Sequence, residues 1–299
     1  MAEPNFTGRT AIVTGAAKGL GEAYARWLAD RGCAVVISNR VSADGSSQAQ
    51  AVVDAIMAKG GRAVAHDGPV ETVDAAQEMA EIAKRHFGGI DIFISNAGIV
   101  RFIDFSTVTI EEMREVVDIN LWGALYGLKA VWPSMIERGY GRVVLTGSSA
   151  GMWGQPQSAS YSMSKAAMVG LARSVSLDVP EGKDIKLNVI APAAYTPMSA
   201  GHMGEKWADY ASADRVAPVV GWLCSDLCTT TGGIYHSGAS NVRRVQTIEG
   251  PIEDLNSGPT DEVMGRLVPQ PEWTSSYASG AEVLPELVKA LRQQGGDLG

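Results

Sequence analysis

The sequence predicts an α/β protein with a single doubly wound parallel sheet and a C-terminal extension. Its 299 residues, 45% of them hydrophobic and 19% charged, can bury one sizeable core, and no break in composition divides the chain. Short apolar runs alternate with stretches of helical periodicity, which is the pattern of parallel strands joined by helices. The predicted strands lie near residues 10–14, 34–38, 62–65, 91–95, 142–147, 185–190 and 232–236.

The first predicted strand runs into a turn that is rich in glycine. A helical pattern follows the turn, so backbone N–H groups at a helix N-terminus would face a pyrophosphate. The glycine spacing, Gly-x-x-x-Gly-x-Gly, differs from the common Gly-x-Gly-x-x-Gly dinucleotide fingerprint. A flexible turn without a ligand is the alternative. The candidate phosphate-binding residues of this turn are Gly15, Lys18, Gly19, Leu20 and Gly21.

Polar residues also mark two later strand ends and a long helical pattern. One predicted strand ends in Asn96-Ala97-Gly98, a later one runs into Ser148, and Asn120 lies between them in the helical pattern. Each of these positions alone also has an ordinary structural explanation. Ser148 can be a strand-terminal cap, and Asn120 can be a hydrogen-bonded helix asparagine.

Tyr161 and Lys165 lie four positions apart in a stretch that predicts the first turns of a helix, so the phenol and the ammonium share one face. A tyrosine hydroxyl with an ordinary pKa near ~10 is a poor acid or base at neutral pH. A fixed cation one turn away favours the phenolate and lowers that pKa. The pair therefore predicts a proton-transfer site, although this spacing also arises in helices by accident.

In order and approximate spacing, these motifs resemble those of the classical short-chain dehydrogenase/reductase family, and the likeness spans roughly residues 7 to 245. The resemblance implies a Rossmann-like fold. It also implies an NAD(P)-dependent oxidoreductase that interconverts a secondary alcohol and its ketone. The alternative is a catalytically idle dinucleotide-binding scaffold protein.

The resemblance also implies roles for individual side chains. Ser148 would polarise the substrate oxygen and Tyr161 would exchange the proton. Lys165 would lower the pKa of Tyr161 and hydrogen-bond the nicotinamide ribose, and Asn120 would hold a water for proton relay. The implied catalytic residues are Asn120, Ser148, Tyr161 and Lys165. The implied cofactor-binding residues are Gly15, Lys18, Gly19, Leu20, Gly21, Asn39, Arg40, Asn96, Ala97, Gly98, Tyr161, Lys165, Pro192 and Thr196.

Several segments are similar to one branch of the family, the (R)-3-hydroxyacyl-CoA dehydrogenase module of multifunctional β-oxidation enzymes. These segments are residues 191–198, 216–225 and 231–233. The likeness suggests a 3-hydroxyacyl thioester or another bulky apolar substrate. The loop 195–210, with Met198, Met203 and Trp207, occupies the family's substrate-lid position, or else these apolar side chains belong to the ordinary core.

The end of the second predicted strand bears on the choice of cofactor. NAD-preferring members of this fold carry an Asp or Glu there, which binds the adenosine ribose and repels a 2′-phosphate. Here the strand ends in Asn39 and Arg40, and Lys18 lies in the glycine turn. Two cations without an anion favour NADP(H) over NAD(H). If both cations are solvated and Asn39 binds a bare ribose, NAD(H) is favoured instead.

Charge and cysteine content bear on partners and compartment. A net charge of -8 without a basic cluster predicts no nucleic-acid partner, and no apolar run approaches the ~20 residues of a membrane span. Three cysteines without secreted-domain spacing predict reduced thiols in the cytoplasm. Cys224 and Cys228 are expected on one helix face near His236, but no metal site is expected because a fourth ligand is missing. A small-molecule substrate and a homo-oligomer, dimer or tetramer, follow from the family resemblance.

Two regions are expected along the chain. Residues 1–248 form a dinucleotide-binding catalytic domain, and residues 249–299 form a C-terminal extension that packs on the core or on a sister subunit. The extension begins with proline, glycine and serine, which indicates an irregular path. Residues 283–294 predict a terminal helix with an apolar stripe, and Trp273 and Tyr277 supply anchors.

Overall fold

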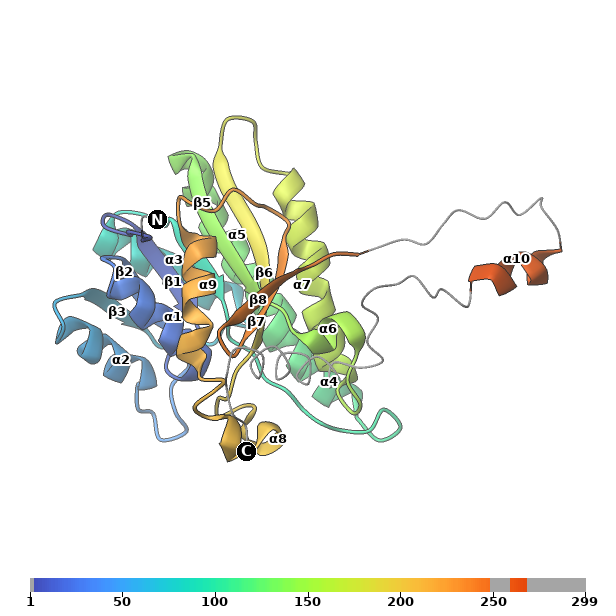
Figure 1. Cartoon of the computed structure of the whole chain (residues 1–299). Helices are drawn as coiled ribbons and strands as arrows, with labels where there is room; N and C mark the ends of the chain where they lie inside the picture. Colours follow the sequence, from blue (N-terminus) through green and yellow to red (C-terminus); the bar gives the residue numbers. More distant parts are fainter. Residues whose placement is uncertain (1–2, 248–258, 268–299) are drawn as a thin grey trace.

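One eight-stranded sheet forms the centre of the molecule in the computed structural model, which describes residues 3–247 and 259–267 (Figure 1). The strand order is β3-β2-β1-β4-β5-β6-β7-β8. The strands β1 to β7 are parallel, and β8 runs antiparallel to β7 at the edge. The strands are β1 (Thr10–Thr14), β2 (Ala34–Ser38), β3 (Arg62–His66), β4 (Ile92–Ser95), β5 (Tyr140–Thr146), β6 (Asp184–Ala193), β7 (Ile234–Gly238) and β8 (Asn241–Val245).

Helices cover both faces of this sheet (Figure 1). They are α1 (Gly19–Ala29), α2 (Gln48–Met57), α3 (Val73–Phe87), α4 (Ile110–Val117), α5 (Gly123–Arg138), α6 (Ser149–Trp153), α7 (Ala159–Leu177), α8 (Ala200–Met203), α9 (Ala217–Cys224) and α10 (Thr260–Leu267). A π-helical segment, η1 (Asp118–Trp122), joins α4 to α5, and two 3₁₀ turns follow α8, η2 (Glu205–Trp207) and η3 (Ala213–Arg215). Among the described helices, none has the length and apolar character that a bilayer crossing requires.

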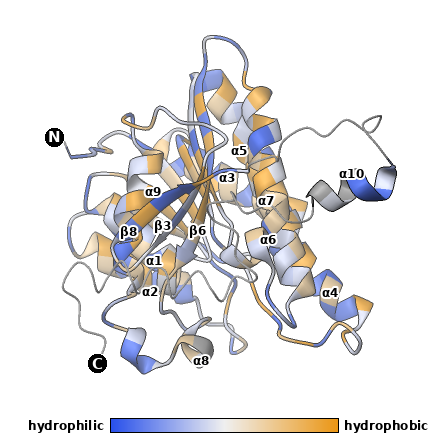
Figure 2. Cartoon of the chain, turned by 45° about the vertical axis from the view of Figure 1, so that its right-hand side comes forward, coloured by the Kyte–Doolittle hydropathy of each residue, from blue (hydrophilic) through white to orange (hydrophobic). Residues whose placement is uncertain are grey.

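The alternation of side chains along the strands divides the core into two layers. Ala11 and Val13 of β1 belong to the layer that α1, α2 and α9 cover, whereas Ile12 belongs to the layer under α3, α5 and α7. All three are fully buried. In Figure 2 the central strands carry mainly hydrophobic colours, whereas the helices carry both kinds. Burial of each Val or Ile side chain stabilises the folded state by about 1.5–3 kcal/mol, so the buried strands contribute a large part of the stability of the fold.

Strand order reverses between β1 and β4, because the chain moves outward to β3 before it returns to β4 on the other side of β1. Loops after β1 and β4 therefore diverge at the carboxyl edge of the sheet and leave a crevice between them. This edge is where the sequence places the glycine turn and the run Asn96-Ala97-Gly98.

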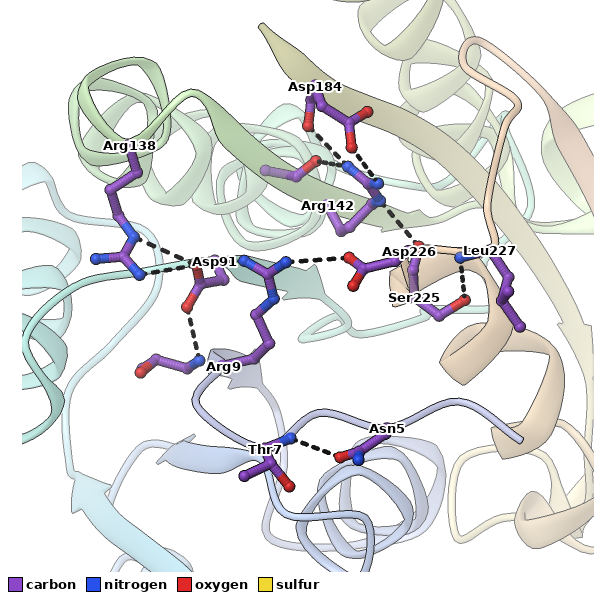
Figure 3. A network of polar contacts seen from close by, with 12 residues as sticks. Asn5, Thr7, Arg9, Asp91, Arg138, Arg142, Asp184, Ser225, Asp226 and Leu227 are labelled. Atoms are coloured by element: carbon purple, nitrogen blue, oxygen red, sulfur yellow. Dashed lines mark hydrogen bonds and ion pairs between the residues drawn. The ribbon is translucent and has the colours of Figure 1, made fainter. Parts of the chain in front are cut away.

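At the opposite edge, a polar network ties the amino ends of four strands together (Figure 3). Asp91, whose side chain is 1% exposed, accepts hydrogen bonds from the Thr10 amide at 2.9 Å and from Arg9 and Arg138. Arg142, equally buried, donates to a carboxylate oxygen of Asp184 at 2.7 Å. Each buried charge has an opposite partner, so the network holds β1, β4, β5 and β6 in register without leaving an unpaired ion.

The predicted parallel sheet is confirmed, and the strand ends differ from the predicted ones by a few residues. The antiparallel strand β8 was not predicted. It follows β7 through a two-residue turn at Ala239 and Ser240, whose φ angles are +47° and +61°. Positive φ at both positions is typical of a type I′ turn, for which Asn-Gly is the usual signal and Ala-Ser is not. The hairpin is therefore specified by pairing with β7 rather than by local turn chemistry.

The expectation that Cys224 and Cys228 share a helix face is wrong. Helix α9 ends at Cys224 because the next residue, Ser225, is extended (φ -89°, ψ 168°). Cys228 lies in the loop that follows, where its sulfur is 3.6 Å from the Asn188 side-chain amide. The described residues contain no group of three or more side chains that could hold a metal ion.

Most of the predicted C-terminal extension lies outside the described residues. This holds for Trp273, for Tyr277 and for the predicted helix at 283–294. Helix α10, Thr260–Leu267, lies in a stretch for which an irregular path was predicted. The division into regions 1–248 and 249–299 stays a prediction.

Candidate active site

A cavity of about 490 Å³ opens at the carboxyl edge of the sheet, at the point where the strand order reverses. It brings together all the predicted cofactor-binding residues except Gly21. The predicted residues that line it are Gly15, Lys18, Gly19, Leu20, Asn39, Arg40, Asn96, Ala97, Gly98, Tyr161, Lys165, Pro192 and Thr196. Residues more than 180 positions apart thus share one wall because the parallel strands end there.

The glycine turn packs so closely against the loop after β4 that side chains are excluded. Gly15 has φ +61°, and a Cβ there would lie 2.8 Å from the Ala97 Cα. A Cβ on Gly21 would overlap the Gly15 carbonyl oxygen and lie 2.6 Å from the Asn96 amide nitrogen. Gly21 therefore does not face the cavity; it allows α1 to approach the turn.

Asn96 and Thr14 join the ends of β1 and β4. The Thr14 hydroxyl accepts hydrogen bonds from the backbone amides of Asn96 and Ala97, both at 3.0 Å. The Asn96 side-chain amide donates to the carbonyls of Thr14 and Gly15 at 3.0 and 3.1 Å. These bonds fix the floor of the cavity, so Asn96 has a structural contribution as well as a place in the wall.

The start of α1 is suited to an anionic group. Its N-cap, Lys18, has no side-chain acceptor, and within the described chain no side chain caps the first turn. The uncapped N–H groups and the helix dipole favour a phosphate at this position. On the other wall, the Thr146 hydroxyl is buried and has no hydrogen-bond partner among the described residues. Both features fit a bound dinucleotide, which would satisfy these groups.

Two cations face the cavity beside the end of β2. Lys18 is exposed, whereas the Arg40 guanidinium is paired with Glu71, Nη2 to Oε1 at 2.6 Å. The Asn39 side-chain amide donates to the Arg40 carbonyl at 2.8 Å. The carboxylate that NAD-preferring members of this fold carry at this strand end is absent, but a carboxylate from the loop after β3 reaches the arginine instead.

Tyr161 and Lys165 lie on the first turns of α7, as the sequence predicts, and both line the cavity. Lys165 is 4% exposed, and its Nζ donates to the Thr146 carbonyl at 2.8 Å. The same Nζ lies 5.7 Å from the centre of the Tyr161 ring. Ser148, the N-cap of α6, lies near enough to the Tyr161 hydroxyl to lower its pKa and accepts a hydrogen bond from the Ala150 amide at 3.1 Å. Ser148 therefore caps α6 and also lies beside the Tyr161 hydroxyl.

Burial controls the protonation of this pair in the protein without cofactor. Burial raises the pKa of Tyr161, and the hydrogen bond from Ser148 opposes that increase only in part. Burial also lowers the pKa of Lys165 to about 8. The lysine is therefore charged at neutral pH, and the phenol is protonated. A lowering of the Tyr161 pKa by Lys165 stays a prediction.

Asn120 lies in the π-helical segment between α4 and α5, so the long helix is distorted at this residue. Its Oδ1 accepts from the Ile99 amide at 2.8 Å, and its Nδ2 donates to the Ile99 carbonyl and to the Ser164 hydroxyl at 2.9 and 3.2 Å. Ser164 in turn donates to the Tyr161 carbonyl. A Cβ on Gly98 would lie 3.0 Å from Asn120 Oδ1 and 3.5 Å from Lys165 Nζ. Asn120 and Lys165 therefore both lie close to Gly98.

The cavity also includes residues that motif reasoning missed. They are Val41, Gln48, Gly68, Val70, Ile99, Ile119, Thr146, Gly147, Ala194, Pro197 and Ser199. Most of them directly follow a strand or lie on the loop after one. This position after a strand is the sequence signal from which they could have been predicted. Of the predicted lid residues, Met198 lines the cavity, whereas Trp207 packs against Ala239. The lid loop is therefore partly ordinary core.

The comparison with known families agrees with this geometry, since the family described as short chain dehydrogenase matches residues 9–206. The chain belongs to this family. One relative of this short chain dehydrogenase is the peroxisomal multifunctional enzyme type 2 of Mus musculus, which is 35% identical over 274 residues. The match covers 88% of this chain but 37% of the mouse protein, so the chain spans little more than a third of that relative's length.

Two further relatives match the short chain dehydrogenase over most of their own length. The 3-oxoacyl-[acyl-carrier-protein] reductase of Synechocystis is 33% identical over 228 residues, which are 74% of this chain and 91% of that protein. The crystal structure of a short chain dehydrogenase from Mycobacterium avium superimposes with a TM-score of 0.77 at 31% identity and covers 88% of this chain and 94% of that one. The chain is an NAD(P)-dependent oxidoreductase with the fold of this family.

Proposed function

We propose that this short chain dehydrogenase interconverts a secondary alcohol and its ketone on a 3-hydroxyacyl or 3-oxoacyl thioester. The proposal rests on Tyr161 and the buried Lys165, which share one helix face at the cavity wall, with Ser148 beside the Tyr161 hydroxyl. The name of the Synechocystis relative, 3-oxoacyl-[acyl-carrier-protein] reductase, supports this substrate class. No observation favours an idle scaffold, because the acid-base pair faces the cavity.

Different residues of the site have different roles in carbonyl reduction. The chemistry that NAD(P)(H) supplies when bound is hydride transfer to or from the substrate carbon. The Ser148 hydroxyl donates a hydrogen bond to the substrate oxygen and stabilises the negative charge that develops there. The Tyr161 hydroxyl gives that oxygen its proton, and in alcohol oxidation the Tyr161 oxygen takes the proton back.

Lys165 and Asn120 serve this proton transfer. The Lys165 ammonium would stabilise the phenolate that Tyr161 becomes and would hold a ribose hydroxyl of the cofactor. Asn120, in its π-helical segment beside Gly98, would hold a water that returns a proton from solvent. The N-terminus of α1, where Gly19 and Leu20 begin the helix, would hold the phosphate groups.

We further propose that NADP(H) is preferred over NAD(H). Lys18, Asn39 and Arg40 line the cavity, and the β2 strand end carries no carboxylate. Arg40→Ala should therefore reduce the ratio of kcat/KM for NADPH to that for NADH by about tenfold, because a charge-assisted contact to the 2′-phosphate is lost. Steady-state kinetics with both cofactors measure the ratio. Arg101→Ala, a change on the Glu115 ion pair outside the cavity lining, is the control. A wild-type preference for NADH would refute the proposal.

We also propose that the protein forms a homo-oligomer, either a dimer or a tetramer. We propose that it is located in the cytoplasm. Trp122 and Met163 are 42% and 52% exposed on contacting helical segments, which supports an interface between copies. Free, buried cysteines at 33, 224 and 228 fit a reducing compartment. The mouse relative is named as peroxisomal, so imaging of the tagged chain in its own cells is the test of the compartment.

A substrate screen tests the proposed function. Purified protein with NADPH or NADH is offered 3-oxoacyl-CoA, steroid ketones and small alicyclic ketones while absorbance of the reduced cofactor is followed. We expect the highest kcat/KM with the 3-oxoacyl thioester. Turnover of the other ketones alone would contradict the substrate class, and no turnover with any ketone or alcohol would contradict the reaction type.

A further inference from the structure

The ion pair between Arg40 and Glu71 joins a residue of the cavity wall to a residue behind it. Arg40 lines the cavity at the end of β2, and Glu71 follows Val70, which also lines it. The Arg40 side chain is 54% exposed and the Glu71 side chain 25%, so the carboxylate is the less hydrated partner. The 2.6 Å separation between Nη2 and Oε1 indicates a strong charge-assisted contact.

The ion pair with Arg40 compensates the negative charge of the Glu71 carboxylate. Its Oε2 is buried and has no hydrogen-bond partner among the described residues, and the Arg40 guanidinium donates to its Oε1 at 2.6 Å. If Arg40 turned away toward a ligand, a largely buried carboxylate would lose its counter-ion, which is unfavourable. Arg40 is therefore held by Glu71 and would meet a ligand with part of its charge neutralised, whereas Lys18 is exposed.

We propose that Glu71 is a specificity-determining residue that weakens selection for a 2′-phosphate on the cofactor by neutralising Arg40. The inference rests on the proposed dinucleotide site. A 2′-phosphate placed beside Arg40 meets the negative charge of Glu71 one guanidinium away, whereas the 2′-hydroxyl of NAD(H) carries no charge and is insensitive to it. Lys18 then supplies the remaining positive charge for the phosphate.

The prediction is that Glu71→Gln tightens binding of 2′-phosphorylated ligands alone. Glutamine keeps the shape and removes the charge. We expect the Kd for adenosine 2′,5′-bisphosphate to fall about three- to tenfold, while the Kd for adenosine 5′-monophosphate changes less than about twofold. Isothermal titration calorimetry on the full chain measures both without turnover. NADPH and NADH, followed by cofactor fluorescence, should show the same difference.

Two controls separate Glu71 from a general change in charge. Glu115→Gln removes a carboxylate from an ion pair of the same 2.6 Å length, with Arg101 outside the cavity lining, and should leave both dissociation constants unchanged. In an Arg40→Ala background, Glu71→Gln should have less than half of its effect on the 2′-phosphate, because the group that it neutralises is absent. If Glu71→Gln fails to fold, as judged by circular dichroism, Glu71→Ala replaces it.

The outcomes distinguish this inference from the proposed function. Weaker or unchanged binding of adenosine 2′,5′-bisphosphate in Glu71→Gln, with the wild type binding both nucleotides, overturns the role of Glu71 and leaves the oxidoreductase intact. An equal gain in the Arg40→Ala background overturns it as well. Failure of the wild type to bind any adenine nucleotide or dinucleotide would instead contradict the dinucleotide site itself.

Discussion

At the residue scale, two buried groups determine how a proton can move in the site. Burial raises the pKa of Tyr161 and lowers that of Lys165 to about 8, so each environment favours the neutral form. Ser148, beside the Tyr161 hydroxyl, opposes this increase in the pKa of Tyr161. Ketone reduction needs the protonated phenol and alcohol oxidation needs the phenolate, so the two directions should respond to pH with opposite signs.

The two directions of reaction provide the first test of this proton balance. kcat/KM for alcohol oxidation should increase with pH up to about 8, the pKa of Lys165, and level off above it as the ammonium that stabilises the phenolate is lost. kcat/KM for ketone reduction should not increase over the same range. Initial rates in both directions with saturating cofactor provide the measurement. Parallel profiles in the two directions would contradict Tyr161 as the proton carrier.

The sequence predicted that two site residues lie side by side only where both belong to one helix or strand. Tyr161 and Lys165 were predictable because helical periodicity alone puts them on one face of α7. The Thr146 carbonyl that receives the Lys165 ammonium was not, because that contact joins β5 to α7 and depends on how they pack. The pairing of Arg40 with Glu71 was not predictable for the same reason, since it links the ends of two neighbouring strands.

At the element scale, the carboxyl ends and the amino ends of the strands have different functions. The carboxyl edge holds the cavity, and the amino edge holds the network around Asp91 (Figure 3). The parallel sheet was predictable from the alternation of apolar runs and helices. Strand β8 was not predicted, because its sequence, Asn-Val-Arg-Arg-Val, lies at the sheet edge and the Ala-Ser turn before it lacks the usual hairpin signal.

Asp91→Asn should destabilise the fold without changing the chemistry. The buried carboxylate holds Arg9, Arg138 and the Thr10 amide, so loss of its charge should lower the free energy of unfolding by about 2–4 kcal/mol. Urea unfolding measures the change. Asp226→Asn is the matched control, because its side chain is 65% exposed and its pair with Arg9 should contribute less than about 1 kcal/mol. Equal effects of the two changes would contradict the role of Asp91.

At the scale of the whole molecule, the chain combines a closed core with an apolar surface on its helices. Trp122 of η1 stacks on Tyr126 with ring centres 5.8 Å apart, and Met163 of α7 is 52% exposed. Exposed aromatic and thioether side chains on contacting helical segments are typical of interfaces. The distortion that places Asn120 in the site thus also places Trp122 at the surface, so one helical segment serves both the site and the proposed interface.

Trp122→Glu should reduce the proposed homo-oligomer to a smaller species. A charge in the centre of an apolar interface leaves an unpaired buried ion in the assembled state, which favours separate subunits. Light scattering coupled to size-exclusion chromatography measures the mass. Leu177→Glu, at the 85% exposed C-terminal residue of α7, is the control and should leave the mass unchanged. An unchanged mass in Trp122→Glu would place the interface elsewhere.

The most direct test of the acid-base chemistry is a single-turnover comparison of the wild type with Tyr161→Phe. Protein loaded with NADPH is mixed rapidly with a 3-oxoacyl-CoA, and the absorbance of the reduced cofactor is followed, while cofactor affinity is measured separately by fluorescence. We expect Tyr161→Phe to lower the rate of cofactor oxidation by about a hundredfold to ten-thousandfold, because the hydroxyl that protonates the substrate oxygen is gone. Cofactor affinity should stay within about twofold of the wild type, since the ring remains. A rate equal to that of the wild type would contradict Tyr161 as the catalytic acid and, with it, the proposed reaction.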